Sequence, residues 1–177
     1  MAAKEVVKYG DPILRKKTAD VEDFTQLTDL VEQMFDTMVE EEGIGLAANQ
    51  IGVDLNLLVF EVIDLDEDID SGKVVMANAE IIASSGKEMM EEGCLSLPDV
   101  RIELERPEQI TVRYQDISGT IQETSFTGMQ SRVIQHEFDH LHGRFITDYL
   151  TPAKKSLIQK RLQEIAKNGK PSRSVVL

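Results

Sequence analysis

The stretch that says most about this chain is Gln135-His136-Glu137-Phe138-Asp139-His140-Leu141. Two imidazoles four residues apart on a helix project from one face, so His136 and His140 can bind one metal ion. Glu137 stands beside that pair, where a carboxylate can take the proton from a metal-bound water. The same pattern also arises by chance on charged helices. In that interpretation one histidine packs against the core, the other faces solvent, and Glu137 and Asp139 are surface acids.

A cysteine upstream extends the metal interpretation. Cys94 lies in Glu92-Gly93-Cys94-Leu95-Ser96 and is the only cysteine of the chain. One thiolate and two imidazoles leave a fourth tetrahedral position for water, as a catalytic site needs. A closed structural site needs another ligand, and His142 is the only further histidine, so the common zinc-finger ligand sets cannot be completed. The alternative is that Cys94 is buried as a small hydrophobic residue.

The third notable stretch is Gly43-Ile44-Gly45-Leu46-Ala47-Ala48-Asn49-Gln50. Its glycines and small residues permit close approach of the backbone to another group. The alternative is a helix stop followed by a tightly packed turn. The stretch lacks the further glycine and the preceding strand of a phosphate-binding loop, so such a loop is disfavoured.

The first half of the chain predicts one helix and two strands. Apolar residues recur at helical spacing between Thr25 and Glu42, which predicts an amphipathic helix that stops at Gly43. Residues 55–63 are typical of a buried strand. The acidic residues 64–70, with Ser71 and Gly72, predict a solvated hairpin connection into a strand over residues 73–83.

The second half predicts a hairpin followed by two helices. Strands are expected at residues 110–116 and 120–126, joined by a turn at Ser118 and Gly119. Residues 129–141 predict a helix ended by Gly143 in the left-handed conformation, and Thr151 with Pro152 opens another helix that runs to about Asn168. Strands and helices segregate without regular alternation, which favours an α+β fold.

Length and composition indicate an ordinary globular chain. The 177 residues fit one domain, residues 1–177, of which about 151–177 form a C-terminal helix and basic tail. Hydrophobic residues make up 41% and charged residues 29%, which argues against disorder. The N-terminus lacks the pattern of a signal or transit peptide, and the longest apolar run, residues 55–63, is interrupted by Asn56 and Glu61. We therefore expect neither secretion nor membrane insertion, and a cytoplasmic location.

The charge distribution is uneven. The net charge is −13, which argues against specific DNA binding, because such binding needs many Lys and Arg contacts to phosphate. From Ala153 onward, seven basic residues face one acid, Glu164, so this part carries +6 and the rest −19. The basic helix is either a solvated surface or a binding site for an anionic partner. The seven basic residues are Lys154, Lys155, Lys160, Arg161, Lys167, Lys170 and Arg173.

Taken together and in this order, the three stretches resemble the motifs of the peptide deformylase family. The resemblance extends to residues 9–15, to the Arg106-Pro107 pair and to Gly143. It implies a single catalytic domain with antiparallel β-sheets packed around the central helix, an N-terminal helix and a C-terminal helix. It also implies removal of the N-formyl group from the N-terminal formylmethionine of newly synthesised polypeptides, with release of formate.

Functional residues are implied position by position. The resemblance makes Glu137 the general acid/base, which assists attack by a metal-bound water or hydroxide. It implies one divalent ion, which in this family is generally ferrous iron in cells, while zinc, nickel or cobalt can occupy the site. The implied metal ligands are Cys94, His136 and His140, and the implied oxyanion donors are Gln50 and the backbone amide of Leu95.

Substrate contacts follow from the same resemblance. The family binds the peptide as an added strand, with methionine in an apolar pocket. Four of the residues that match substrate contacts could equally be packed in the core. The fifth, Arg101, could equally be an exposed residue of a strand. Asn49 departs from the family, which frequently has proline there. Residues 86–91 also differ from the family, so the resemblance does not define the rim of the methionine pocket. The matching positions are Ile44, Gly45, Met90, Arg101 and Val133.

Two rival functions remain. A metallopeptidase with the same helix motif usually takes its third ligand from downstream, where this sequence offers only His142, Asp148 and Glu164. A metal-free module that binds the ribosome would use the basic tail alone, but it leaves the three motifs unexplained. Metal content separates these interpretations.

Overall fold

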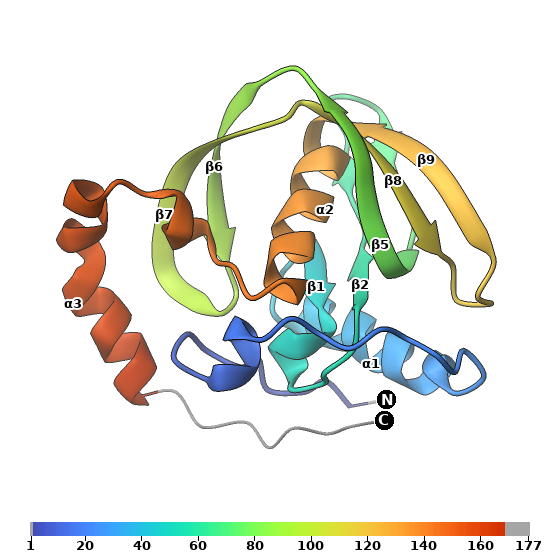
Figure 1. Cartoon of the computed structure of the whole chain (residues 1–177), viewed down its shortest axis with the longest axis horizontal. Coiled ribbons are helices and arrows are strands. Elements are labelled where there is room, and N and C mark those ends of the chain that lie inside the picture. The colour runs from blue at the N-terminus through green and yellow to red at the C-terminus, as the bar shows by residue number, and fades with distance from the viewer. Residues whose placement is uncertain (1, 169–177) are drawn as a thin grey trace.

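The computed structural model describes residues 2–168 (Figure 1). Three α-helices and nine strands form within this part of the chain. The helices are α1 (Leu27–Glu40), α2 (Gly128–Leu141) and α3 (Pro152–Asn168), with short 3₁₀ turns η1 (Pro12–Arg15), η2 (Ala48–Ile51) and η3 (Ile146–Tyr149). The strands are β1 (Gly45–Ala47), β2 (Leu57–Phe60), β3 (Ile63–Asp64), β4 (Ile69–Asp70), β5 (Val74–Ser85), β6 (Glu88–Cys94), β7 (Leu97–Arg106), β8 (Gln109–Gln115) and β9 (Ile121–Thr127).

The strands pair only with antiparallel neighbours. One sheet has the order β1-β2-β5-β8-β9, while β6 with β7 and β3 with β4 form separate two-stranded sheets. Figure 1 shows α2 in the middle, with the β6–β7 hairpin on one side and the larger sheet on the other. The predicted α+β fold with antiparallel sheets around a central helix is confirmed.

The apolar side of the central helix α2 sets its position, and a glycine after its last residue sets where it ends. Ile134 and Leu141 are fully buried against residues of β2, β5 and β8. The helix ends at Leu141, and Gly143 follows the C-cap residue His142 with a φ of +75°, in the left-handed region. The N–H of Gly143 donates to the carbonyl of His140 at 3.1 Å. A Cβ at Gly143 would lie 2.4 Å from the carbonyl oxygen of Arg15, so glycine is required there, as predicted.

Three apolar clusters hold these elements together. The first lies between α1 and the strands β1, β2 and β5, and the second between α2 and the large sheet. The third joins the N-terminal segment and α3 to β7, along which Val100, Ile102 and Leu104 alternate with exposed residues. Each fully buried side chain of this kind contributes roughly 1.5–3 kcal/mol of transfer free energy.

Helix α1 is shorter than predicted. The amide and hydroxyl of Thr25 bond the Asp23 carboxylate, which holds a turn and delays the helix to Leu27. At the other end Glu42, with φ of +56°, takes the left-handed position, and the N–H of Gly43 bonds the carbonyl of Met38. The helix therefore ends at Glu40, before the predicted stop at Gly43, because the terminating turn uses Glu42.

Other predicted elements differ in extent. Residues 55–63 form the buried strand β2 over four residues, and Ile63 belongs to the separate β3–β4 ribbon. The β6–β7 hairpin was not predicted as a pair of strands. No helix among residues 2–168 is long and apolar enough to span a membrane.

Candidate active site

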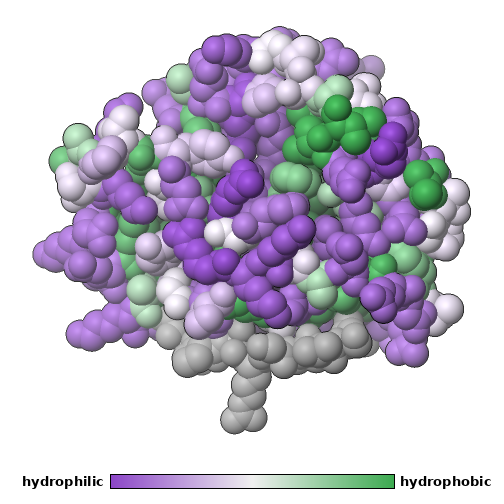
Figure 2. All heavy atoms as spheres, viewed as in Figure 1, coloured by the Kyte–Doolittle hydropathy of each residue, from purple (hydrophilic) through white to green (hydrophobic). Residues whose placement is uncertain are grey.

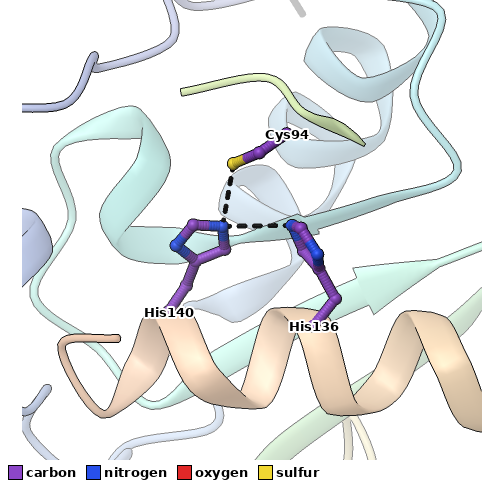
Figure 3. Close-up of side chains that lie close together, drawn as sticks. All are labelled: Cys94, His136 and His140. Carbon is purple, nitrogen blue, oxygen red and sulfur yellow. Dashed lines mark hydrogen bonds between the residues drawn. The ribbon is translucent and has the colours of Figure 1, made fainter. Parts of the chain in front are cut away.

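Cys94, His136 and His140 converge at one point, as Figure 3 shows. Cys94 comes from the end of β6 and both histidines from α2. Their ligand atoms all lie within 4.8 Å of one another, with 3.2 Å from Cys94 Sγ to His140 Nε2 and 3.2 Å between the two Nε2 atoms. The alternative in which one histidine faces solvent is wrong, because His140 is 1% exposed and the His136 side chain 11%.

The surroundings of this cluster affect the two histidines in opposite ways. Glu92 Oε1 lies 2.9 Å from His136 Nδ1, which leaves Nε2 facing the cluster. Burial lowers the pKa of His136, but Cys94, Glu92 and Glu137 outweigh it and raise that pKa well above its ordinary value. Burial, with the charge of His136, lowers the pKa of His140. A thiolate and two imidazoles fit a borderline-soft divalent ion at this position.

Glu137 is a buried carboxyl group beside the cluster. It is 5% exposed and its Oε2 has no hydrogen-bond partner, so its interpretation as a surface acid is wrong. Burial raises its pKa to about 7, although the charge of His136 acts in the opposite direction. A carboxyl group that titrates near neutral pH suits proton transfer.

Gly45 allows the backbone of β1 to approach this carboxyl group. A Cβ at Gly45 would lie 2.8 Å from Glu137 Oε1 and 2.6 Å from Val133 Cγ1. Contacts under 3.0 Å force a shift of the neighbouring atoms, and both neighbours belong to the site. Close approach, and not only a tight turn, therefore explains this glycine.

Gln50 presents its amide nitrogen to the same side. Its Oε1 accepts a hydrogen bond from the Ala47 N–H at 3.0 Å, so the amide orientation is defined. Its Nε2 lies 3.9 Å from Cys94 Sγ and 3.2 Å from Ser96 Oγ. Leu95 lies between Cys94 and Ser96 in the turn that follows β6.

A cavity of about 550 Å³ opens beside the cluster. It brings together all the predicted substrate contacts, and Arg101 at its rim forms an ion pair with Glu91. Sequence reasoning missed further lining residues, among them Glu42, Met129 and Arg132. The predicted residues on its wall are Ile44, Gly45, Gln50, Met90, Cys94, Leu95, Arg101, Val133, His136 and Glu137.

A buried ionic network supports the site and was also missed. Arg106 donates to both oxygens of Glu92 at 2.7 and 3.1 Å and to Asp139 at 2.8 Å, and Arg132 donates to Glu92 at 2.8 Å. Burial raises the pKa of Glu92, but the bonds from His136 and Arg106 hold it at about 2. One signal was available: Arg132 precedes His136 by one helical turn, on the same face.

The downstream residues do not join the cluster. His142 Nδ1 lies 2.8 Å from the carbonyl oxygen of Phe138, and its ring stacks on that of Phe138. Asp148 binds Arg15, and Glu164 pairs with Arg161. In residues 2–168 the third candidate ligand is thus the upstream Cys94.

Comparison with known proteins agrees with this arrangement. The family model described as polypeptide deformylase matches residues 3–156. A peptide deformylase of Thermotoga neapolitana is 42% identical over 164 residues, which cover 92% of this chain and 96% of that relative. A peptide deformylase 2 of Xanthomonas campestris is 39% identical, covering 95% of this chain and 99% of the relative.

Solved structures are similar as well. The peptide deformylase of Thermus thermophilus superposes with a TM-score of 0.87 at 37% identity, covering 95% of this chain and all of that one. A plant peptide deformylase gives a TM-score of 0.85 at 32% identity, with 99% and 98% covered. The chain therefore belongs to the polypeptide deformylase family of enzymes.

Proposed function

We propose that this enzyme is a metal-dependent hydrolase that removes the N-formyl group from the N-terminal formylmethionine of newly synthesised polypeptides. One observation carries the proposal. Three donor atoms from Cys94, His136 and His140 lie within 4.8 Å of one another, next to the buried Glu137 and beside a cavity of about 550 Å³. Such a cluster in a concave site suits metal-assisted hydrolysis.

Cys94, His136 and His140 would hold one divalent cation. When bound, the cation supplies Lewis acidity, which lowers the pKa of water and polarises the formyl carbonyl. We propose ferrous iron as the ion in cells, with zinc, nickel or cobalt as possible replacements. The mixed thiolate and imidazole set supports this range, because borderline-soft ions accept both kinds of ligand.

Glu137 moves the proton of the attacking water. Addition of water to the formyl carbon produces a tetrahedral oxyanion, and Glu137 accepts the proton that the water loses. It then delivers this proton to the methionine nitrogen as the carbon–nitrogen bond breaks, so that formate and a free amine leave. The pKa of about 7 supports both directions of transfer near neutral pH.

Gln50 and the backbone amide of Leu95 would stabilise the oxyanion. Both lie beside Cys94, and the Nε2 end of Gln50 faces the thiol while Ala47 fixes the other end. Fixed donors placed where negative charge develops lower the barrier without reorganisation. Loss of one such donor costs roughly 100-fold to 1000-fold in rate.

The substrate would lie as an added strand between β1 and β6. Both are edge strands that pair on one side only, which supports this placement. Ile44, Met90 and Val133 would form the apolar pocket for methionine, and Gly45 would contribute its backbone. Arg101, exposed at the rim, would contact the chain beyond the first residue.

The whole chain, residues 1–177, would form one catalytic domain in the cytoplasm of a bacterium. Helix α3 would contact the ribosome through Lys154, Lys155 and Lys160. Arg161 is less suited to this role, since its guanidinium donates to the carbonyl of Pro98 and pairs with Asp99. Lys170 and Arg173 lie outside the described residues.

Anaerobic hydrolysis of formyl-Met-Ala-Ser by the ferrous protein tests the proposal. We expect formate and free Met-Ala-Ser in equal amounts, and loss of release after a chelator removes the metal. Cleavage of an internal peptide bond without formate would instead identify a metallopeptidase. A protein that binds no stoichiometric metal would leave the ribosome-binding module as the better account.

A further inference from the structure

The hairpin that carries Cys94 is not part of the five-stranded sheet. Strands β6 and β7 pair only with each other, so no sheet hydrogen bonds connect them to the five-stranded sheet. The apolar side of β7 packs on the N-terminal segment and α3, not on α2. The third apolar cluster and a hydrogen bond from the Tyr9 N–H to the Ser96 carbonyl also hold the hairpin, but they do not involve α2, so side-chain bonds to α2 connect it directly to the helix of the two histidines.

Arg132 makes three of these bonds, more than any other residue of α2. Its Nη1 donates to Glu92 Oε2 at 2.8 Å and to the carbonyl of Leu104 at 2.9 Å, and its Nη2 donates to the carbonyl of Glu88 at 2.7 Å. One guanidinium thus bonds both strands of the hairpin. The side chain is 4% exposed, so these bonds form away from solvent, where losing one is costly.

The guanidinium of Arg132 also donates one of the hydrogen bonds that hold the Glu92 carboxylate. Oε2 accepts from Arg106 and Arg132, and Oε1 accepts from Arg106 and faces His136 Nδ1. The carboxylate is therefore held in one orientation, with one oxygen directed at the imidazole. Outer partners of this kind set the orientation of a ligating histidine ring.

We infer that Arg132 is a positioning residue for the metal site: it fixes the β6–β7 hairpin, and with it Cys94, at one position against α2, and it orients Glu92 toward His136. The inference rests on the proposed function, because it assigns Arg132 to the metal site of that function. Arg132 touches neither the ligand atoms nor the reacting groups of the substrate in this account.

The test is anaerobic titration of metal-free protein with Co²⁺, followed by the absorption of the cobalt–thiolate bond and by competition with a chelator. Arg132→Met should weaken Co²⁺ binding by about 10-fold to 100-fold and alter the thiolate absorption, as loss of outer-shell partners does. Arg132→Lys keeps the positive charge but replaces the planar guanidinium and its several fixed donors by one ammonium group. The Co²⁺ affinity of this variant should therefore fall between those of the wild type and Arg132→Met.

Two controls separate positioning from general stability. Arg113→Met removes an arginine of an exposed ion pair on β8 and should leave Co²⁺ affinity and absorption unchanged. Met34→Ala opens the core under α1 and should lower the melting temperature without changing the cobalt spectrum. Should Arg132→Met fail to fold, Arg132→Lys alone decides the question.

The inference is overturned if the folded Arg132 variants bind Co²⁺ with wild-type affinity and spectrum, or lose no more affinity than Met34→Ala. The proposed function fails in a different way. In that case the wild-type protein itself does not bind one Co²⁺ per chain or releases no formate from formyl-Met-Ala-Ser.

Discussion

Gly45 and Glu137 show how the absence of one side chain shapes the site. The Glu137 carboxyl group is buried, and burial is what raises its pKa to about 7. It can lie so close to β1 only because Gly45 has no Cβ. The sequence motif places Glu137 beside two histidines. The burial that raises its pKa, however, depends on the close approach of Gly45, which lies far away in the chain.

Gly45→Ala is therefore expected to impair catalysis. The new methyl group would displace Glu137 or Val133, and a misplacement of about 1 Å can cost roughly 100-fold in rate. The measurement is kcat/KM for formyl-Met-Ala-Ser at equal metal content. Gly72→Ala serves as the control, since a Cβ there meets no atom within 4 Å and only its φ of +61° is unfavourable. Equal rates for wild type and Gly45→Ala would contradict the assigned role.

The sequence predicted the three residues that converge at the site, but not the network that supports them. His136 and His140 follow from helical spacing, and Cys94 from the family motif. The pairing of Arg106 and Arg132 with Glu92 joins residues 14 and 40 positions apart. Helical spacing places Arg132 beside His136, but it does not identify Glu92 as the partner. Buried charges are found where they can be paired, so the network became visible only with the fold.

At the scale of elements, periodicity and turn chemistry predicted much of the fold. Helices α2 and α3 and the β8–β9 hairpin lie close to their expected positions, because their apolar spacing and their glycine or proline residues agree. Strand β6, Glu-Met-Met-Glu-Glu-Gly-Cys, contains no β-branched residue and no clean alternation. Its strand conformation is imposed by pairing with β7, which explains why it was missed.

The turns η1 and η3 are joined by a charged contact near the end of α2. Asp148 accepts hydrogen bonds from Arg15 at 2.6 and 3.2 Å and from the Phe145 N–H at 3.0 Å. Burial raises the pKa of Asp148, but the bonds from Arg15 and Phe145 outweigh it and lower that pKa below its ordinary value of 3.8. A depressed pKa stabilises the folded state above pH 3.8, and this contribution is lost as the pH falls further.

Asp148→Asn should therefore lower the free energy of unfolding at neutral pH, and the difference from wild type should shrink as the pH falls below 3.8. Denaturant titrations at several pH values measure this difference. Arg15→Gln removes the partner and should show the same trend. A difference that stays constant down to acidic pH would argue against the contact as the cause.

At the scale of the whole molecule, charge is segregated. The face drawn in Figure 2 is mostly hydrophilic, and α3 lies along one side of the molecule in the same view. The segment from Ala153 carries +6 within a chain of net charge −13. Cationic side chains bound to RNA phosphates release counterions, so a ribosome contact through α3 would weaken as salt rises.

Reversal of Lys154, Lys155 and Lys160 to Glu is expected to abolish cosedimentation with ribosomes while formate release from the free peptide stays unchanged. The wild-type protein should lose ribosome binding progressively as salt is raised. Reversal of Lys17, Lys73 and Lys87 to Glu is the matched control, because it makes the same charge change at exposed positions outside α3. Binding by the lysine-reversed variant that is equal to wild type and insensitive to salt would exclude α3 as the contact.

The most direct test of the proposed chemistry compares wild type with Glu137→Gln at measured metal content. We expect one divalent ion per chain in both proteins, because Cys94, His136 and His140 are intact. We also expect formate release from formyl-Met-Ala-Ser to fall at least about 100-fold in the variant, since glutamine cannot carry the proton. Release within a few-fold of wild type at equal metal content would contradict the role of Glu137 and the mechanism built on it.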